Sequence, residues 1–385
     1  MKVELFAEKL RELGVRTVTG IPDSTLRQFC DYIGSEGKGL FERHIVVENE
    51  GACIGIAIGE YLSTGVPACV YMQNSGLGNT VNPLTSLAHS DVYGIPILLI
   101  VGWRGEPGIK DEPQHKYMGK ITLKLLELLD ISYAIVDSQT TEEELQGFLK
   151  KAMDAFTKKK QYAFVIRRDT FEKRETAHYR NRYLLKRDCA IEMIAEWLRQ
   201  DDIVISTTGK ISREIYEACN KIWGGHKQTF LTVGGMGHAG MIAYRIAERK
   251  PGQRVICLDG DGALLMHMGS LAVIGQNSVS NLVHIGINNE AHESVGGMAT
   301  GAAGLSYAGI AESSGYRKVY RAMDEAELRK ALETIRTEKQ MVFLEIFVAI
   351  GSRPDLGRPK ETAEENREVF MRFLKTDGKE KGRKK

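Results

Sequence analysis

An acidic residue flanked by glycines, followed at a fixed distance by paired asparagines, is the strongest chemical signal in the sequence. Gly260-Asp261-Gly262 and Asn288-Asn289 are separated by 25 residues. Carboxylate and amide oxygens are hard ligands that suit Mg²⁺, which completes its octahedron with phosphate oxygens and water. Glycines on both sides of Asp261 would let a diphosphate approach the backbone and the start of a following helix. The spacing therefore predicts a metal–diphosphate site.

The segments around these residues predict how they are brought together. Val255–Leu258 and Leu282–Ile287 are short apolar runs typical of buried strands, and Ala263 to Gln276 is typical of an apolar helix. The acidic residue and the asparagines then lie just beyond the carboxyl ends of two strands. Ligands of open parallel sheets bind outside such ends, so both groups are expected to face one ligand.

A second candidate is a glutamate in the N-terminal half. Glu50 follows an expected strand, His44–Val47, and precedes Ala52–Leu62, which is small and apolar all round. That composition predicts a helix buried against other backbone. A carboxylate at the mouth of a buried helix is costly unless it is paired or functional. Glu48, two residues earlier, is the alternative to Glu50.

Loops before helices supply further candidates. Gly20-Ile-Pro-Asp-Ser24 precedes a helix expected to extend through Tyr32, with Asp23 or Ser24 as its N-cap. The glycine-containing loop Gln73–Asn79 precedes a helix expected from Val81 to His89. The segment Trp103–Gly119 interrupts the alternation and is expected to be a long functional loop or lid. It carries the basic residues Arg104, Lys110, His115 and Lys116.

Alternating strands and helices in both halves predict an α/β fold with two doubly wound parallel-sheet domains. The 385 residues are too many for one ordinary core. We expect a first domain over 1–170, a polar linker over 171–187 and a second domain over 188–360, followed by a C-terminal helix and basic tail over 361–385.

Composition excludes several classes of protein. The net charge of +2 gives no argument for nucleic acid or an anionic membrane, and the longest apolar runs are too short to span a bilayer. The N-terminal residues do not have the form of a signal peptide. Six cysteines without a CxxC pair are expected to be free thiols packed as small hydrophobes. A globular, cytoplasmic protein is expected.

A dinucleotide-binding motif offers a competing interpretation. Gly235-x-Gly237-x-x-Gly240 follows an expected strand, and Asp259 lies nineteen residues beyond Gly240. This arrangement is close to the fingerprint of NAD-dependent dehydrogenases. The motif begins after a later strand of the second domain, however, and it leaves Asp261 and the asparagine pair without a purpose. The dehydrogenase is therefore the remote alternative.

Taken together, the motifs resemble those of the thiamine-diphosphate-dependent decarboxylases. Besides the metal–diphosphate spacing, Glu50-Gly-Ala-Cys53 resembles the segment with the activating glutamate, and Gly235-Met236-Gly237 resembles the turn that holds the cofactor bent. Further stretches resemble the phosphonopyruvate decarboxylases, with the sulfopyruvate decarboxylases close to them. These stretches are Gly20–Ser24, Gln73–Asn79 and Asn288–Gly297.

The resemblance implies a reaction and its cofactors. The reaction is decarboxylation of 3-phosphonopyruvate to phosphonoacetaldehyde and CO₂, within phosphonate biosynthesis, with thiamine diphosphate and Mg²⁺. Sulfopyruvate or another 2-oxo acid is the alternative substrate, since phosphonate and sulfonate are both tetrahedral anions. The resemblance also implies a homo-oligomer, a dimer or larger, with active sites between subunits. A degenerate cofactor-binding subunit is not favoured, because Glu50 and Asp261 are both present.

The resemblance finally assigns roles to residues. Glu50 would be catalytic through N1′ of the aminopyrimidine, and Asp261, Asn289 and the carbonyl of Ala291 would hold the metal. The residues expected at the cofactor are Asn74, Ser75, Gly76, Leu77, Gly209, Gly235, Met236, Gly237, Gly260, Asp261, Gly262 and Asn289. The candidates for binding the substrate's anion are Asp23, Ser24, Arg104, His115, His292, Arg353 and Arg358.

Overall fold

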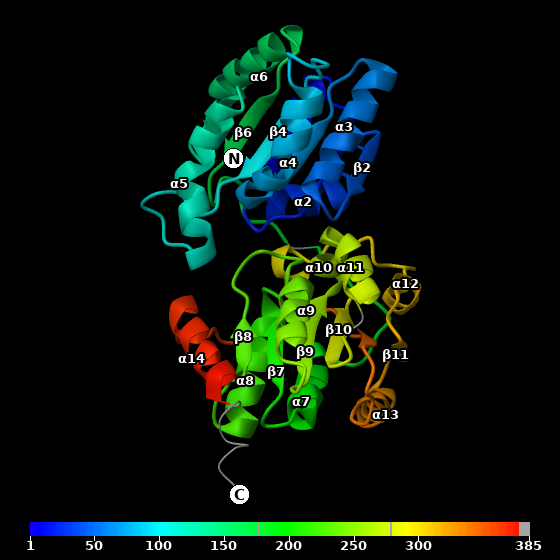
Figure 1. Ribbon diagram of the computed structural model, residues 1–385. Helices are drawn as coiled ribbons and strands as arrows, with labels where there is room; N and C mark the ends of the chain where they lie inside the picture. The colour runs from blue at the N-terminus through cyan, green and yellow to red at the C-terminus, as the bar shows by residue number, and fades with distance from the viewer. Residues whose placement is uncertain (176, 278, 377–385) are drawn as a thin grey trace, which may run out of the picture. The chain divides into compact units, whose positions relative to one another are not determined.

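The computed structural model describes residues 1–175, 177–277 and 279–376, which form two compact units (Figure 1). Unit 1 comprises Met1–His178 with His292–Thr300, and unit 2 comprises Tyr179–Ala291 with Gly301–Lys385. The chain first passes from unit 1 to unit 2 between His178 and Tyr179, inside the segment expected to be a linker. It returns to unit 1 for His292–Thr300, which lie within the range expected for the second domain. Most of the expected basic tail, residues 377–385, lies outside the described residues. No helix in the described part of the chain is long and apolar enough to cross a membrane.

Unit 1 is built around a six-stranded parallel sheet in the order β2-β1-β3-β4-β6-β5. Its strands are β1 (Thr17–Gly20), β2 (Arg43–Val46), β3 (Cys69–Gln73), β4 (Leu98–Gly102), β5 (Ser132–Val136) and β6 (Tyr162–Ile166). Its helices are α1 (Val3–Glu12), α2 (Arg27–Gly34), α3 (Glu50–Thr64), α4 (Leu77–Pro83), α5 (Pro113–Leu128) and α6 (Glu142–Thr157). Short turns, η1 (Asn74–Gly76) and η2 (Leu84–Ala88), flank α4.

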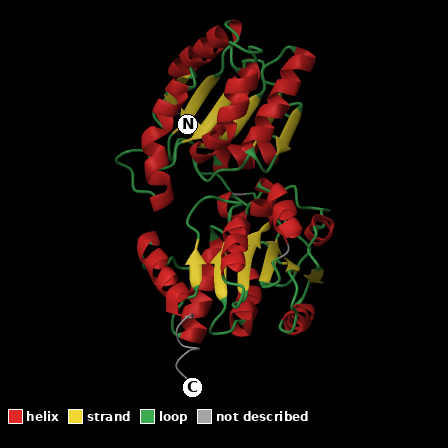
Figure 2. Ribbon diagram, in the orientation of Figure 1, coloured by secondary structure: helices red, strands yellow, loops and turns green. Residues whose placement is uncertain are grey.

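Helices cover both faces of this sheet (Figure 2), which explains the near-continuous apolar strands. On one face, Ile54 of α3, Leu77 of α4 and Leu126 of α5 join a single core with β3 and β4. On the other face, Phe6 of α1 packs edge-on against Phe29 of α2 and Phe164 of β6, with ring centroids 5.9 Å apart in each pair. A sheet buried on both faces leaves only the strand ends and loops for chemistry.

Unit 2 repeats the architecture in the strand order β11-β12-β10-β9-β7-β8, again all parallel. Its strands are β7 (Ile203–Ser206), β8 (Thr229–Leu231), β9 (Val255–Gly260), β10 (Leu282–Asn288), β11 (Lys318–Ala322) and β12 (Val342–Phe347). Its helices are α7 (Arg187–Trp197), α8 (Lys210–Trp223), α9 (Ala239–Arg249), α10 (Asp261–Met266), α11 (Gly269–Asn277), α12 (Tyr307–Ser314), α13 (Glu325–Ile335) and α14 (Ala363–Thr376); η3 (Glu293–Val295) is a single turn.

The edge strand β8 is closed by the last helix, which lies beside it (Figure 1). Asn366 of α14 is buried, accepts a hydrogen bond from Leu231 N at 3.0 Å and donates one to Thr229 O at 3.0 Å. One side-chain amide thus satisfies a donor and an acceptor that an edge strand would otherwise expose. The C-terminal helix expected from the sequence is therefore part of the second sheet's packing.

Four expected elements differ from the structure. The helix expected from Val81 to His89 begins at Leu77, and its second half is the π-helical segment Leu84–Ala88. The helix expected from Ser24 begins at Arg27, because Asp23 accepts hydrogen bonds from Thr25 N and Gln73 Nε2 within the loop. Half of the expected lid is helical: α5 begins at Pro113, where a missing N–H costs nothing. The single helix expected over 263–276 is two helices, α10 and α11, which are separated at His267-Met268.

Burial of an edge-strand histidine gives unit 1 a pH-dependent stability. His44 of β2 lies with Nε2 3.0 Å from Tyr71 Oη, and burial lowers its pKa from 6.5 to about 4. Because the folded pKa is below the unfolded one, the unfolded chain takes up a proton first as the pH falls below about 6.5. The free energy of unfolding of wild type is expected to fall by about 2–3 kcal/mol between pH 7 and pH 4.5 from this group.

This prediction is tested by urea unfolding of wild type and His44→Gln at both pH values. The variant should lose less stability than wild type on acidification. His178→Gln is the matched control, since His178 is exposed. Equal losses in wild type and His44→Gln would show that His44 does not carry the effect.

Candidate active site

Four neighbouring strands bring the predicted cofactor residues of unit 2 to one edge of its sheet. β10, β9, β7 and β8 are adjacent and parallel. The register pairs Ile287 with Gly260, so Asp261 and Asn289 leave neighbouring strands within one residue of the same level. Both side chains are nearly buried, at 6 % exposure each. Gly209 and the turn Gly235–Gly237 follow β7 and β8 at the same edge.

The turn after β10 is held in one conformation by its own side chains. Asn288 Oδ1 accepts from Glu290 N at 3.0 Å, and Asn289 Oδ1 accepts from Ala291 N at 3.1 Å. Glu290 adopts a left-handed backbone conformation, φ 58°, and its carboxylate accepts a 2.7 Å hydrogen bond from Tyr183 Oη. An amide oxygen has two lone pairs, so Asn289 Oδ1 can accept this bond and also bind a cation.

The glycines at this edge have conformations that suit close approach of a ligand. Gly209, Gly235 and Gly237 have φ values of 100°, 64° and 84°, where a side chain would be strained. A Cβ at Gly237 would also lie 2.6 Å from His267 Cδ2. Hard oxygens on adjacent strand ends, together with glycine turns at helix starts, fit a magnesium ion bound to a diphosphate.

Glu50 in unit 1 is a nearly buried carboxylate with a defined partner. It is the first residue of α3, is 6 % exposed, and accepts a 2.7 Å hydrogen bond at Oε2 from Asn79 Nδ2. A Cβ at Gly76 would lie 2.5 Å from Glu50 Oε1, so glycine is required at that position. Asn49 caps the helix by accepting from Gly51 N at 2.8 Å. The local structure therefore fixes this carboxylate beside Gly76.

Glu48, the alternative, has different surroundings. Its Oε2 lies 3.1 Å from Nε2 of His292, which belongs to the same unit. His292 is buried as well. Glu48 thus lies within ion-pairing distance of an imidazole, whereas the partner of Glu50 is a neutral amide, Asn79. This contrast favours Glu50 as the catalytic carboxylate.

The segment after β3 contains buried residues that stabilise the fold and one exposed residue, Ser75. Asn74 is fully buried, donates 2.8 Å hydrogen bonds to Arg104 O and Thr122 Oγ1, and accepts from Arg104 N at 3.3 Å. Leu77 is part of the core. Ser75 is exposed and donates to Gln73 Oε1 at 2.8 Å. Contacts of Asn74 and Leu77 with a cofactor remain predictions, because their side chains serve the fold.

A polar cluster occupies the carboxyl ends of β1, β3 and β4. Arg104 donates to Asp111 through Nε at 2.8 Å and through Nη2, and its Nη1 donates to Ser24 Oγ at 2.7 Å. Asp23, with no exposed surface, accepts from Gln73 Nε2 at 2.7 Å. A Cβ at Gly102 would lie 2.3 Å from Asp23 Oδ2. These residues are far apart in sequence and form one network.

The charges in this cluster are compensated. Burial works against ionisation of Asp111, but hydrogen bonds from Arg104 and from the N–H groups of Glu112 and Gly105 hold its pKa well below the usual range. The hydrogen bond to Asp111 raises the pKa of Arg104. Burial, and then the charge of Arg104, lower the pKa of His115. The cluster thus presents a charged guanidinium, a hydroxyl and a neutral imidazole.

The other predicted anion ligands belong to unit 2 or have partners outside this cluster. His292 lies at Glu48. Arg353 belongs to unit 2 and pairs with Glu217 and Asp355. Arg358, also in unit 2, is exposed. Sequence reasoning missed Gln73 and Asp111 as members of the cluster. The signal available for Gln73 was its place at the carboxyl end of β3, whereas Asp111 lies well inside the loop between β4 and α5.

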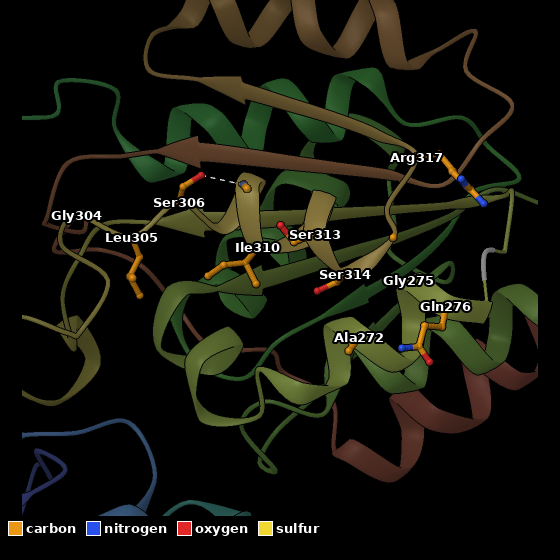
Figure 3. A pocket seen from close by; sticks show the side chains of 12 residues that line it. Ala272, Gly275, Gln276, Gly304, Leu305, Ser306, Ile310, Ser313, Ser314 and Arg317 are labelled. Carbon is orange, nitrogen blue, oxygen red and sulfur yellow. Dashed lines mark hydrogen bonds between the residues drawn. The ribbon is translucent and has the colours of Figure 1, made fainter.

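A surface groove of unit 2 lies elsewhere. It has a volume of about 880 Å³ and follows the surface between α11 and α12, where Gln276, Ile310 and Ser313 line it (Figure 3). Gly275 packs directly on Ser314 there, whose carbonyl oxygen would lie 1.9 Å from a Cβ at that position. Arg317 is the one titratable side chain in its lining. The groove therefore offers little chemistry compared with the strand ends.

Known proteins match the chain over most of its length. Residues 2–124 match the N-terminal TPP binding domain of thiamine pyrophosphate enzymes, and residues 207–346 match their C-terminal TPP binding domain. These matches and the two parallel sheets define a thiamine-pyrophosphate-dependent enzyme. The fold and cofactor expected from the sequence are confirmed, and the dinucleotide-binding alternative is wrong. The Gly235–Gly240 motif in fact follows an edge strand, β8.

Individual relatives narrow the class. A phosphonopyruvate decarboxylase of Streptomyces viridochromogenes is 34% identical over 95% of this chain and 93% of its own length. A sulfopyruvate decarboxylase of Methanosarcina acetivorans is 23% identical over 91% of this chain and 92% of its own length. A sulfopyruvate decarboxylase subunit alpha of Methanococcus maripaludis is 36% identical over 39% of this chain and 84% of its own length. The chain belongs to the family of the phosphonopyruvate decarboxylases.

Proposed function

We propose that this chain decarboxylates 3-phosphonopyruvate to phosphonoacetaldehyde and CO₂, with thiamine diphosphate and Mg²⁺. Full-length identity of 34% to a phosphonopyruvate decarboxylase supports the substrate. The single structural observation that carries the activity is the nearly buried Glu50, held by Asn79 and approached by Gly76. Sulfopyruvate is the second candidate substrate, because a relative that matches over most of both chains is named a sulfopyruvate decarboxylase.

The residues of unit 2 would hold the cofactor's diphosphate and its metal. Asp261 and Asn289 would supply a carboxylate and an amide oxygen, and the carbonyl of Ala291 a third ligand. Gly235 and Gly237 leave room on both sides of Met236, which would support the bent cofactor. When bound, thiamine diphosphate supplies the electron sink that lets a 2-oxo acid lose CO₂.

Glu50 would handle a proton at the cofactor's aminopyrimidine ring. Because Asn79 Nδ2 fixes Oε2, Oε1 beside Gly76 is the oxygen that would give and take this proton. Burial excludes water from the carboxyl and strengthens its hydrogen bonds. The protein's contribution is thus the position and protonation of one carboxyl group.

The cluster at β1, β3 and β4 is the best candidate for binding the phosphonate. Arg104 Nη1 can donate a second hydrogen bond besides the one to Ser24, and the Ser24 hydroxyl can donate to an anion. Asp111 fixes the orientation of the guanidinium, as bidentate pairs do. His115, neutral at neutral pH because its pKa is lowered, can donate one further hydrogen bond.

Arg104→Lys should therefore lower kcat/KM for phosphonopyruvate by about 30–300-fold, because an ammonium cannot replace the bidentate fork. Turnover of pyruvate, which carries no second anion, should change much less. Ser24→Ala, which leaves the Arg104–Asp111 pair intact, should cost about 10-fold for phosphonopyruvate. Steady-state kinetics with both substrates measure this. Equal losses for both substrates would assign Arg104 to the fold and not to the anion.

The functional form is proposed to be a cytoplasmic homo-oligomer with active sites between subunits. The Methanococcus maripaludis relative is itself named as a subunit. Light scattering of the purified protein tests the proposal, and a monomeric active enzyme would contradict it.

The reaction is tested by aldehyde release from phosphonopyruvate, sulfopyruvate and pyruvate in parallel, with thiamine diphosphate and Mg²⁺ present. Preferred turnover of phosphonopyruvate is expected. Turnover of sulfopyruvate alone would retain the cofactor assignment and change the substrate. Absence of turnover of all three 2-oxo acids would overturn the proposed reaction.

A further inference from the structure

Unit 2 contains a completely buried carboxylate behind the proposed metal site. Glu345 lies on β12, next to β10, and has no exposed surface. Its Oε1 accepts from Asn288 Nδ2 at 3.2 Å and Tyr307 N at 3.4 Å, and its Oε2 accepts from Ala308 N at 3.0 Å. Arg321 Nε is 3.6 Å from Oε2. A buried carboxylate is costly unless such partners compensate it, so this network needs an explanation.

The hydrogen-bond partners of Glu345 contact both segments that carry the proposed metal ligands, the end of β9 and the turn after β10. Asn288 immediately precedes Asn289, and its Oδ1 accepts the Glu290 N–H that shapes the turn. Tyr307, fully buried at the start of α12, donates its hydroxyl to the backbone carbonyl of Asp261 at 3.0 Å. One carboxylate and one phenol therefore connect the end of β9 with the end of β10.

We propose that Glu345 and Tyr307 are positioning residues for the Mg²⁺–diphosphate site, an inference that rests on the proposed function. They touch neither metal nor cofactor. Glu345 fixes the side chain of Asn288 and thereby the turn that carries Asn289, and it anchors the start of α12. Tyr307 then fixes the backbone from which the Asp261 side chain extends.

The expected effect is on metal affinity. Mg²⁺ requires near-ideal octahedral geometry, so small displacements of its ligands weaken binding. Loss of residues that orient ligands typically costs about 10–100-fold in metal affinity. A residue that only stabilises the fold would lower the unfolding free energy without this change.

The test is a calorimetric titration of Mg²⁺ into the full chain with saturating thiamine diphosphate and no substrate. Tyr307→Phe, which removes only the hydroxyl, is expected to raise the Kd for Mg²⁺ about 10-fold. Glu345→Gln places an amide N–H₂ among N–H donors and is expected to raise it by up to about 100-fold. Excess Mg²⁺ should restore the activity of Tyr307→Phe, which would not follow from a folding defect.

Tyr320→Phe is the matched control. It removes a hydroxyl of the same unit that donates to Glu338 at 2.8 Å and has no bond to the metal loops. Its Kd for Mg²⁺ should equal that of wild type, whatever its stability.

Two results would overturn the proposal, and they can be told apart. In the first, wild type binds Mg²⁺, and the Kd of Tyr307→Phe and of Glu345→Gln stays within twofold of the wild-type value. This result would refute the positioning role and leave the metal site in place. If Glu345→Gln does not fold, Tyr307→Phe decides by itself. Absence of Mg²⁺ binding in wild type would remove the metal site, and the proposed function and this inference with it.

Discussion

Glu50→Gln is expected to lower kcat by about 10²–10⁴-fold, the usual contribution of a positioned acid–base group. Glutamine has nearly the same size, and its carbonyl oxygen can still accept the hydrogen bond from Asn79, so the local structure should persist. It cannot give up or take up a proton beside Gly76. Thiamine diphosphate should still bind, because unit 2 would hold its diphosphate. Steady-state kinetics with saturating cofactor, together with calorimetric cofactor binding, measure both quantities.

Glu48→Gln is the matched control for this prediction. It removes the same charge two residues away, where the partner is His292 at 3.1 Å. Its kcat should fall by less than about 10-fold, since the carboxylate that is lost pairs with His292 and is not the one beside Gly76. Because the side chains of this pair are only 5 % and 11 % exposed, its loss should mainly lower stability. A large loss in Glu48→Gln with a small loss in Glu50→Gln would transfer the catalytic role to Glu48.

The candidate site residues at the strand ends of unit 2 could be predicted, because each lies close in sequence to the strand that positions it. Asp261 and Asn289 each lie within three residues of the end of an apolar run, and a parallel pair of strands places such residues side by side without further assumptions. The register of β9 with β10 places these two residues on neighbouring strand ends. The buried residues that hold Asp261 and Asn289 in place could not be predicted. Glu345 is a lone acidic residue in an apolar strand, and its partners at Asn288 and Tyr307 are 57 and 38 residues away.

The polar cluster of unit 1 likewise depends on contacts between residues far apart in sequence, which could not be predicted. Arg104 was a candidate because it is basic and follows a strand, whereas the pairing that fixes it depends on the path of the chain to Asp111. The sequence predicts a long functional loop or lid along that path. The structure holds it by hydrogen bonds to Asp111 and by Trp103 Nε1, which donates to Gly119 O at 2.9 Å. Gly105 and Gly119 pack backbone to backbone there, a contact that sequence periodicity cannot reveal.

Asp261→Asn is expected to weaken Mg²⁺ binding by more than about 100-fold, because losing a charged ligand should cost more than losing a residue that only orients a ligand, which costs about 10–100-fold. The change keeps the side chain's size and one oxygen, and it removes the negative charge that offsets the dication. Removal of Mg²⁺ with EDTA should inactivate wild type, and added Mg²⁺ should restore it at far lower concentration than in the variant. Asp201→Asn, at an exposed residue of the same unit, should leave Mg²⁺ binding unchanged.

The effect of Asp261→Asn on Mg²⁺ binding distinguishes two possible metal sites, because their ligand atoms differ in chemistry. Among the described residues, Cys257, Asp259 and His284 also come together, fully buried and with ligand atoms within 4.8 Å. A thiol and an imidazole favour Zn²⁺ over Mg²⁺, whereas Asp261 and Asn289 offer only oxygen. Mg²⁺ affinity in Asp261→Asn within threefold of wild type would contradict the oxygen site. Loss of Mg²⁺ binding in Asp261→Asn, with binding intact in Cys257→Ser, would assign the metal to the ends of β9 and β10.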